Sequence, residues 1–553
     1  MGRLRLAAGT AAIAFVAGCS LLLDTAEATQ CSTQRDCEST SALRNRVCKE
    51  GFCVLPGADD LPPVSVDGGG TGCGTTELCT QANSGRISVC KSPGGSCTPW
   101  QTEQCSTVAG SIKDPEAVVI GSIFPLTAKQ VSGEAIDYPY AQRLRNALSF
   151  AIKDFEKQLP GGAFAAGDGK QRPFAVIHCD SRQTAEGAMS AFQHLTEVVG
   201  VQAIVVGSDD DMAAIAAAAT TKKTAIACSD CVAALPPGPL VWRIGPRIAL
   251  EAPMIARRVL DHEAEIKALP SPPATVKVAV LKTPGRASDA FYEALAPILK
   301  FNGGKSLLAN GADFTVIETD DARVKNVDHD KFATMVASFQ PDILIVAMGD
   351  DFPLFYLPLI ETKMAGAPRK PRYLTTSLNN DVTQFADRLT PELCTRVSGA
   401  RPLYTPEFQA NIDAFVARYL APHNFVQPDG NWTGFEAGYS IALAALAARS
   451  QPIFDGPHIS AGFERLRGGA TKIDFRPDSI PLAFGLLGSP SVQLDVRGLW
   501  SDLDWNVTTR DFDSDVGTYC YYRDGLGNLL QRPNAGPSLD TKTGSFTGTF
   551  SCE

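Results

Sequence analysis

The cysteines are the residues whose type and spacing first suggest chemistry in this sequence. Cys228-Ser229-Asp230-Cys231 has the C-x-x-C spacing of a redox motif and follows an apolar run, as such motifs do. The two residues between the cysteines are not those usual in redox motifs. We therefore favour a structural disulfide, formed either between these two cysteines or between one of them and Cys179.

Other catalytic patterns are absent from the 553-residue sequence. The 6 histidines are scattered and include no His-x-x-x-His pair suited to zinc, and there is neither a G-x-S-x-G turn nor a phosphate-binding P-loop. The net charge of −10, with no long basic run, argues against a nucleic-acid partner, because phosphate binding requires clustered Lys and Arg. We expect a protein that is not an enzyme, with no catalytic residues, metal or cofactor.

Nine of the 16 cysteines are concentrated near the N-terminus, and only six follow residue 105. The nine are Cys31, Cys37, Cys48, Cys53, Cys73, Cys79, Cys90, Cys97 and Cys105. Their separations do not match the closely spaced pairs that hold zinc, so disulfides are expected. The sequence predicts two small Cys-rich modules, residues 19–55 and 73–110, joined by a flexible Pro- and Gly-rich linker at 56–72.

The N-terminus indicates secretion. Arg3 and Arg5 precede a short apolar stretch that ends at Ala17-Gly18-Cys19, which resembles the lipobox of bacterial lipoproteins. The resemblance implies a signal peptide at 1–18 and a lipid on Cys19, and Ser20 favours the outer membrane. The alternative is a plain signal peptide with an incidental cysteine. No run of 18 apolar residues exists, so the expected membrane contact is this lipid.

Excluding Cys19 leaves an odd number of cysteines, so at least one thiol is free or pairs with another chain. Cys520 and Cys552 bracket the C-terminal tail and are expected to tie it down.

Strand-like and helix-like patterns alternate from about residue 116 and then start again. The first series has apolar strands at 117–123, 173–178, 202–206 and 224–228, with helical patterns at 140–155, 185–199 and 212–219. The second has strands at 276–281, 341–347 and 372–376, with helical patterns at 291–299, 332–339 and 352–365. The pattern predicts an α/β fold of two doubly wound, parallel-sheet lobes, with a ligand site at the carboxyl ends of the strands, in a hinged cleft.

Five segments in this region resemble, in order, segments of the type I periplasmic binding proteins. They are residues 119–127, 203–208, 241–246, 435–439 and 473–475. The first resembles the opening strand and loop of that family, and the second its third strand and ligand loop. The third resembles its "V-F-R-x-x-P" segment, the fourth its "Y-D-A-x-Y" helix, and the last its C-terminal strand. The most similar branch is the leucine/isoleucine/valine-binding receptors of ABC transporters.

The resemblance covers roughly residues 116–520 and implies a Venus-flytrap fold in which the chain crosses three times between lobes. Lobe 1 would hold about 116–249 and 404–475. Lobe 2 would hold about 250–403 and 476–553.

The resemblance also places a ligand site on loops of lobe 1. Ser208, Asp209, Asp210 and Asp211 stand where amino-acid binders usually offer Ser or Thr to a ligand carboxylate. Three aspartates would instead repel an anionic group, or they only cap the following helix and face solvent.

Ser229 and Asp230 occupy the segment that holds the ligand amine in the family. A carboxylate at this position suits a cationic or polyhydroxyl ligand.

Lobe 2 is expected to contribute the remaining ligand-binding residues. Arg286 stands where the family often has an aromatic residue, and it pairs either with a ligand acid or with Asp350. Asp351 follows in the same loop, and Ser377 and Asn379 lie where amino-acid binders commonly carry an acid. Asn379 offers both a donor and an acceptor to a neutral ligand.

Two functional hypotheses follow. The first is a lipid-anchored, extracytoplasmic solute-binding protein that captures a small polar ligand of the amino-acid, amide or related class for an inner-membrane ABC permease. The second is a non-transport surface sensor or scaffold with a repurposed or degenerate cleft, which the N-terminal Cys-rich modules favour. Both place the protein in the cell envelope, on the periplasmic face or the outer membrane.

Overall fold

The computed structural model describes residues 47–49, 52–54 and 72–552, apart from 130–134, 166–170, 236–237, 239, 321–326, 380–381, 404–405, 421–431, 452, 500 and 512. The chain divides into two compact units, Met1–Thr71 and Gly72–Glu553. In the first unit, the described residues form one antiparallel hairpin of β1 (Val47–Lys49) and β2 (Phe52–Val54), which places Cys48 opposite Cys53. The predictions for Cys19, Cys31 and Cys37 lie outside the described residues.

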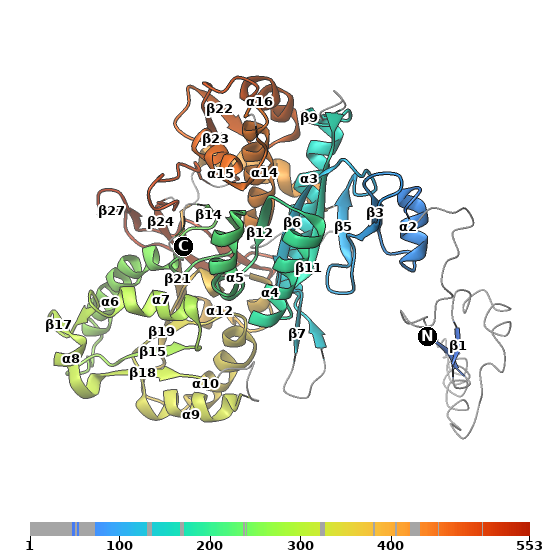
Figure 1. Cartoon of the computed structure of the whole chain (residues 1–553). Coiled ribbons are helices and arrows are strands. Elements are labelled where there is room, and N and C mark those ends of the chain that lie inside the picture. Colours follow the sequence, from blue (N-terminus) through green and yellow to red (C-terminus); the bar gives the residue numbers. More distant parts are fainter. Residues whose placement is uncertain are drawn as a thin grey trace, which may run out of the picture. The chain divides into compact units, whose positions relative to one another are not determined.

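Lobe 1 of the second unit is built on a six-stranded sheet (Figure 1). In spatial order its strands are β14 (Val241–Arg243), β13 (Ala225–Cys228), β12 (Ala203–Val206), β6 (Val118–Phe124), β11 (Phe174–Asp180) and β5 (Thr107–Gly110). The first five run parallel to one another, and β5 runs antiparallel at the edge. The parallel core of this sheet confirms the predicted α/β pattern.

Helices cover both faces of the lobe 1 sheet because its strands are apolar on both sides. Val205 of β12 packs into the core formed with α3 (Pro139–Gln158), α13 (Pro406–Leu420), α14 (Trp432–Ala448), α15 (Gly456–Glu464) and α16 (Ile480–Leu487). Its neighbours Ile204 and Val206 point to the other face. There they pack into the core formed with α4 (Ala185–Gln193), the π-helical turn His194–Val199 and α5 (Asp209–Lys222).

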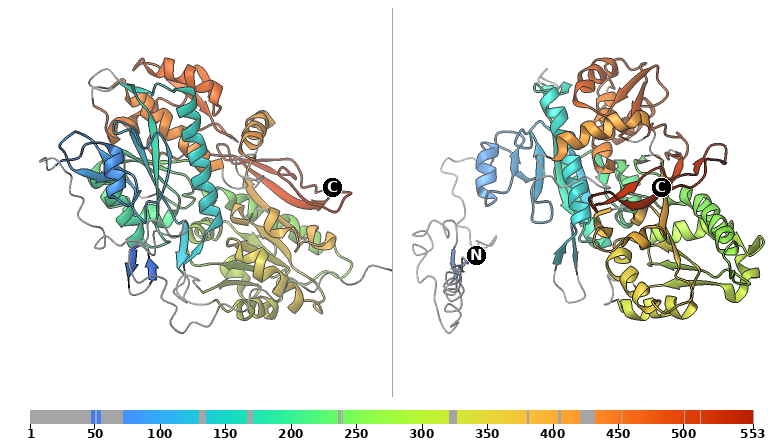
Figure 2. Two further views of the ribbon diagram at one scale, coloured as in Figure 1. Left: turned by 90° about the vertical axis from the view of Figure 1, so that its right-hand side faces the viewer. Right: turned by 180° about the vertical axis from the view of Figure 1, so that it is seen from behind.

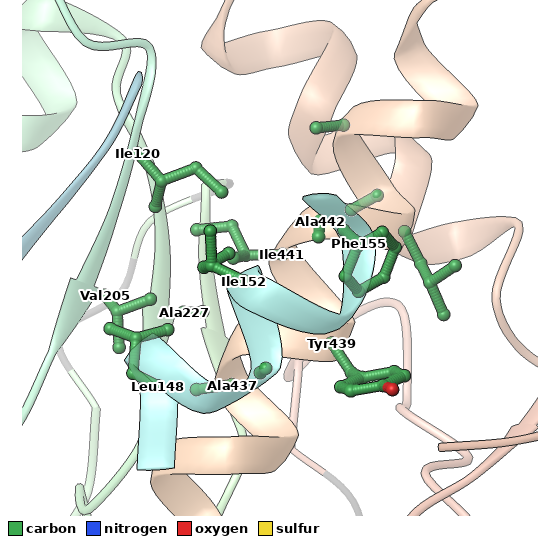
Figure 3. Packing of buried hydrophobic residues seen from close by; sticks show 14 of the residues in the cluster. Ile120, Leu148, Ile152, Phe155, Val205, Ala227, Ala437, Tyr439, Ile441 and Ala442 are labelled. Atoms are coloured by element: carbon green, nitrogen blue, oxygen red, sulfur yellow. The ribbon is translucent and has the colours of Figure 1, made fainter. Parts of the chain in front are cut away.

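Helices α3 and α14 pack against each other and against the sheet, as Figure 3 shows for Leu148, Ile152 and Ile441. Two glycines of α14 make the close approach possible. A Cβ on Gly434 would lie 2.4 Å from the Leu144 carbonyl oxygen, and one on Gly438 would lie 2.6 Å from the Ala151 Cβ. The packing of these helices therefore depends on glycine at both positions.

Lobe 2 is built on a nine-stranded mixed sheet. Its parallel strands are β18 (Phe314–Glu318), β15 (Val278–Lys282), β19 (Ile343–Ala347), β20 (Arg372–Thr375) and β21 (Val397–Pro402). Antiparallel strands extend it: β24 (Val516–Arg523), β25 (Leu529–Arg532), β26 (Ser538–Asp540) and β27 (Ser545–Thr547). Helices α6 (Ala252–Lys267) and α7 (Arg286–Leu295) cover one face, and α9 (His329–Phe339) and α10 (Leu357–Lys363) cover the other.

The last crossing between lobes lies later in the chain than the predicted boundary at residue 476. Strands β22 (Thr471–Asp474) and β23 (Leu494–Arg497) pair with each other, and α16 packs into the lobe 1 core. Trp505 completes that core with its ring against Trp242, at a centroid distance of 6.0 Å. Only from β24 onward does the chain belong to lobe 2, as Figure 1 and Figure 2 show. This aromatic packing is a tertiary contact that the local sequence pattern does not reveal.

Residues 72–110 belong to the same compact unit as lobe 1. Helix α2 (Thr76–Ala82) and the hairpin of β3 (Ser88–Cys90) and β4 (Cys97–Pro99) are held by the disulfides Cys73–Cys90 and Cys79–Cys97. Cys105 bonds Cys179 at the end of β11, so the alternative in which Cys179 pairs with Cys228 or Cys231 is wrong. Strand β5, directly after Cys105, joins the lobe 1 sheet beside β11.

The remaining described cysteines follow the predictions. Cys228 and Cys231 form a disulfide with each other, and Cys520–Cys552 ties the C-terminal tail to β24. Cys394 is a free, buried thiol. None of the helices in the described part of the chain has the length and hydropathy needed to cross a membrane.

Candidate functional site

The carboxyl ends of the lobe 1 strands carry a group of acidic side chains. Ser208, the first predicted site residue, is the N-cap of α5, and its hydroxyl accepts from the Asp211 backbone N–H at 3.1 Å. The capping role that we considered for the aspartates therefore belongs to this serine. The three aspartates after it have three different environments.

Asp209 connects two loops. Its carboxylate accepts from the backbone N–H of Val232 at 3.2 Å and of Ala233 at 3.1 Å, which fixes the segment after the Cys228–Cys231 disulfide against the start of α5. Burial raises the pKa of Asp209 to about 6, although these amide bonds oppose the rise.

Asp211 is 2% exposed, and its Oδ2 finds no hydrogen-bond partner among the described residues. Burial raises its pKa to about 7, partly offset by the hydroxyls of Ser181 and Ser208. A solvent-facing role for all three aspartates is therefore wrong, because this side chain and Asp209 turn inward. A buried carboxyl oxygen without a donor costs stability, and such groups occur at sites where a ligand or a proton completes the bonding.

Asp230 lies in the neighbouring loop, after β13. Burial raises its pKa to about 8, the charge of Asp209 adds to the rise, and a hydrogen bond with the Tyr140 hydroxyl opposes it. Ser229 beside it is fully buried, and its hydroxyl donates to the Val206 carbonyl at 3.1 Å. Ser229 therefore supports the loop, while Asp230 and Tyr140 form a polar pair.

Arg286 is the first residue of α7 in lobe 2, after Gly285, whose φ of 149° favours glycine. Its Nε lies 3.5 Å from Asp210 of lobe 1, and both side chains are about half exposed. The considered pairing with Asp350 is therefore wrong. The ion pair joins the start of α7 in lobe 2 to the first turn of α5 in lobe 1.

The predicted acids of the loop after β19 act on lobe 1 as well. Burial raises the pKa of the Tyr138 phenol, and the carboxylates of Asp350, Asp230 and Asp351 raise it further. Asp351 is half-buried, and burial raises its own pKa, with His329 opposing the rise. The charges of carboxylates from both lobes thus raise the pKa of one tyrosine.

Ser377 and Asn379 are directed into lobe 2. The backbone N–H of Ser377 donates to the buried carboxylate of Glu251 at 2.9 Å. Asn379 is 2% exposed, and its side-chain amide donates to the Met348 carbonyl. The described contacts of these two residues hold the loop after β20, and only Asn379 Oδ1 has no partner among the described residues.

Tyr138 and Tyr140 were not predicted from the sequence as site residues. They flank Pro139, the first residue of α3, and their rings lie 6.3 Å apart. Asp180 at the end of β11 was missed as well. It accepts from the Thr127 hydroxyl at 2.6 Å and so positions the loop after β6. The Tyr-Pro-Tyr sequence at a helix start was the available signal, but its periodicity also fitted a core-facing helix.

Comparison with solved structures identifies proteins of similar fold. No protein-family model and no curated protein matches the sequence. Among solved structures, a solute-binding protein of an ABC transporter from Rhodopseudomonas palustris, in complex with 3,4-dihydroxybenzoic acid, is 15% identical, with a TM-score of 0.51 over 79% of this chain and 98% of that one.

Two further structures show the same likeness. The fatty acid ABC transporter substrate-binding protein from Thermomonospora curvata is 14% identical, with a TM-score of 0.53 over 76% of this chain and 92% of that one. The branched-chain amino acid transporter substrate-binding protein LivJ from Streptococcus pneumoniae, in complex with isoleucine, is 13% identical, with a TM-score of 0.50 over 75% of this chain and 100% of that one. The chain therefore has the fold of the type I periplasmic binding proteins, with disulfide-bonded residues added at its N-terminal side.

Proposed function

We propose that this protein is a solute-binding protein that captures a small polar ligand between its two lobes. The observation that carries the proposal is the meeting of polar groups from both lobes at the carboxyl ends of their strands. Arg286 of lobe 2 lies 3.5 Å from Asp210 of lobe 1. Asp230 and Tyr140 also come from lobe 1, and the charges of Asp350 and Asp351 from lobe 2 act on Tyr138. Ligands of open α/β sheets bind at this edge.

The charges favour a ligand with a cationic group, such as the amino group of an amino acid, an amide-bearing amine or a related compound. Asp209, Asp211 and Asp230 make no ion pair with a described residue, and burial raises the pKa of each. An anionic group placed among them would be repelled, whereas an ammonium group would stabilise their ionised forms. Asp350 and Asp351 would add to this attraction from the other lobe.

A cationic ligand should therefore release protons on binding near pH 7. Asp230, with a pKa of about 8, is largely protonated at that pH without ligand. An ammonium group beside it lowers its pKa and expels the proton to the buffer. Proton release thus distinguishes binding at this site from binding elsewhere on the surface.

We also propose that the protein acts outside the cytoplasm, anchored through a lipid on Cys19, and delivers its ligand to an ABC permease. The five disulfides in the described part of the chain support an oxidising compartment. The three neighbouring structures named above belong to ABC transporters, which supports a permease as the partner.

The experiment is a thermal-shift screen of the full chain against amino acids, amides, polyamines and sugars, followed by calorimetry in two buffers of different ionisation enthalpy. We expect a hit to carry an amino group, to release protons, and to weaken at least tenfold in Asp230→Asn. Asp387→Asn, an exposed aspartate of lobe 2, is the matched control. Unchanged affinity in Asp230→Asn would refute the site, and no stabilising compound in any of the four classes would refute solute binding.

A surface sensor or scaffold is the second candidate. The observation that favours it is the disulfide-bonded segment 72–110, whose strand β5 is built into the lobe 1 sheet and which ligand transport does not require. This candidate predicts that the screen finds no ligand and that an envelope protein co-purifies with the full chain after crosslinking. Loss of that partner on Cys105→Ser with Cys179→Ser, in a protein that remains folded, would support it.

A further inference from the structure

A separate pocket lies near the amino end of strand β11, whereas the candidate site lies at the carboxyl ends of the lobe 1 strands. It has a volume of about 350 Å³ and lies between the hairpin of β9 (Phe164–Ala165) and β10 (Gln171–Arg172), the end of α14, and α16. Strand β11 begins directly after this hairpin and carries Asp180 at its other end, so its seven residues separate the two places by roughly 20 Å. Figure 1 shows β9 and α16 together, away from the β12–α5 connection.

Aromatic rings form the apolar wall of this pocket. Phe164 is buried and packs edge-on against Phe454, at a centroid distance of 5.2 Å. Phe484 of α16 contributes a third, partly buried ring. An apolar ligand group that packs on these rings is removed from water, which favours its binding.

Two arginines supply the charge of the pocket. The Arg449 guanidinium lies 3.6 Å from the Phe484 ring centroid, and that of Arg172 lies 6.0 Å from the Phe454 ring centroid. Arg449 also donates to the Phe484 carbonyl, but neither arginine makes an ion pair with any described residue. Arg172 Nε and Arg449 Nη1 have no hydrogen-bond partner among the described residues.

Among the described residues, the charge that acts on Arg449 comes from another arginine, Arg465. Arg465 of the loop after α15 lies behind it and is itself bonded to carbonyl groups, those of Ala447, Leu487, Ser489 and Val492. Burial lowers the pKa of Arg449, and the charge of Arg465 lowers it further. Arg396, by contrast, is also partly buried but pairs with Glu361 at 2.6 Å.

We propose that this pocket binds a small organic anion, a carboxylate attached to an aromatic or similarly bulky apolar body. The carboxylate would pair with Arg449 and Arg172, and the apolar body would rest on the phenylalanine rings. A pocket of about 350 Å³ holds a ligand of this size. The site is independent of the proposed solute site, whose charge has the opposite sign.

The test uses 3-phenylpropanoate as the anionic probe and 3-phenylpropanamide as its neutral counterpart, each titrated into the full chain by calorimetry at low and at moderate salt. We expect millimolar or tighter binding of the carboxylate, weakened about tenfold in Arg449→Met and in Arg172→Met, because a charge-assisted hydrogen bond contributes that much. The amide should bind at least tenfold more weakly than the carboxylate.

Three variants make the outcome unambiguous. Arg449→Lys keeps the charge and should retain most of the binding, whereas Arg388→Met removes an exposed arginine of lobe 2 and should change nothing. Asp230→Asn should leave the probe affinity unchanged, which separates this site from the proposed solute site. A melting temperature for each variant excludes unfolding as the cause of lost binding.

The proposal is overturned by any of three results. They are no heat of binding at 10 mM probe, equal binding of the amide, or undiminished binding in the Arg172→Met, Arg449→Met double variant. Arg449-dependent sedimentation with phosphatidylglycerol vesicles, without binding of the free probe, would also overturn it, since the arginines would then serve a membrane surface.

Discussion

Two polar clusters adjoin each other at the carboxyl edge of the lobe 1 sheet, and they differ in whether their charges are paired. Arg243, at the end of β14, is fully buried and forms an ion pair with Asp511 at 2.5 Å. Its backbone carbonyl also accepts from the Trp505 indole at 2.6 Å, so one residue holds the first and last crossing segments together. Asp211 is buried and Asp230 is partly buried, but neither has a cation partner among the described residues, and burial raises the pKa of each.

This difference in pairing distinguishes a cluster that stabilises the fold from a cluster that is a candidate for ligand binding, although the two are neighbours. A buried charge with its partner fixes the geometry of the crossing segments, and losing that partner is costly. Buried carboxyl groups without one lower the stability of the unliganded protein, and such costs are retained where a ligand must be bound. In the pocket at the other end of the sheet, Arg172 and Arg449 likewise make no ion pair with a described residue, but there the charge is positive.

The largest expected effect is the loss of the Arg243 partner. Asp511→Asn leaves a buried guanidinium without its counter-charge and should lower the free energy of unfolding by about 3 kcal/mol, measured by urea denaturation. Asp513→Asn is the control, because Asp513 pairs with the more exposed Arg247 at 3.3 Å and should cost less than about 1 kcal/mol. Equal losses in the two variants would mean that burial does not distinguish the clusters.

The second prediction concerns Asp230, whose substitution should raise the stability of the protein rather than lower it. Because its pKa is raised to about 8 in the folded protein, the folded state binds more protons than the unfolded state between the unfolded pKa and that value. Stability therefore falls as pH rises through this window. Asp230→Asn should remove the fall and make the apo protein at least about 1 kcal/mol more stable than the wild type at pH 8, with little difference at pH 4.

Melting temperatures at several pH values check this prediction. Asp387→Asn should show the wild-type pH dependence, since that aspartate is exposed. A variant at Asp230 that is less stable than wild type at pH 8 would show that the carboxylate is needed by the fold, and the contrast between the clusters would disappear.

Substitution of Ser208 should have a smaller effect, and it tests whether this residue caps α5 or contacts the ligand. Ser208→Ala removes the N-cap of α5 and should cost about 1 kcal/mol in unfolding free energy. Ser208→Asp retains a capping oxygen and should restore most of this stability. If Ser208 only caps, ligand affinity should change far less in Ser208→Ala than in Asp230→Asn, and comparable losses would place its hydroxyl on the ligand.

The smallest effect is expected from the Arg286–Asp210 pair. Both side chains are about half exposed, so the interaction is screened by solvent, and Arg286→Met should change stability by less than about 1 kcal/mol. A double-mutant cycle with Asp210→Asn at two salt concentrations measures the coupling. A coupling above about 1 kcal/mol that persists at high salt would show that this pair, rather than a ligand, holds the lobes together.

Much of the fold was predictable because its strands and helices have strong local patterns. The apolar runs 117–123 and 202–206 became the parallel strands β6 and β12, and the residues after them were correctly expected to gather at one edge. Cys520 and Cys552 were correctly paired because they bracket the tail. The lobe boundary after Trp505 was not predictable, because it depends on aromatic packing between distant segments.

The candidate site was predictable in its loops but not in its side-chain contacts. The sequence placed Asp209, Asp210 and Asp211 together, yet one bonds a neighbouring loop, one pairs across the lobes, and one is buried without a partner for its Oδ2 among the described residues. Consecutive residues at a helix start point in different directions, so their partners come from elements far away in the sequence. Tyr138 was not predicted for the same reason, because the carboxylates that act on it come from distant segments of the chain.

The sequence by itself determined the alternating α/β pattern, the positions of the acidic loops and the abundance of cysteine. These are local properties, fixed by hydrophobic periodicity and residue chemistry. Only the tertiary structure decided which charges are paired, that Cys105 bonds Cys179, and that two arginines without an ion pair to any described residue lie beside three phenylalanine rings. Pairing and burial depend on distances between segments remote in the chain, and those distances set the pKa values and the unsatisfied bonds on which binding depends.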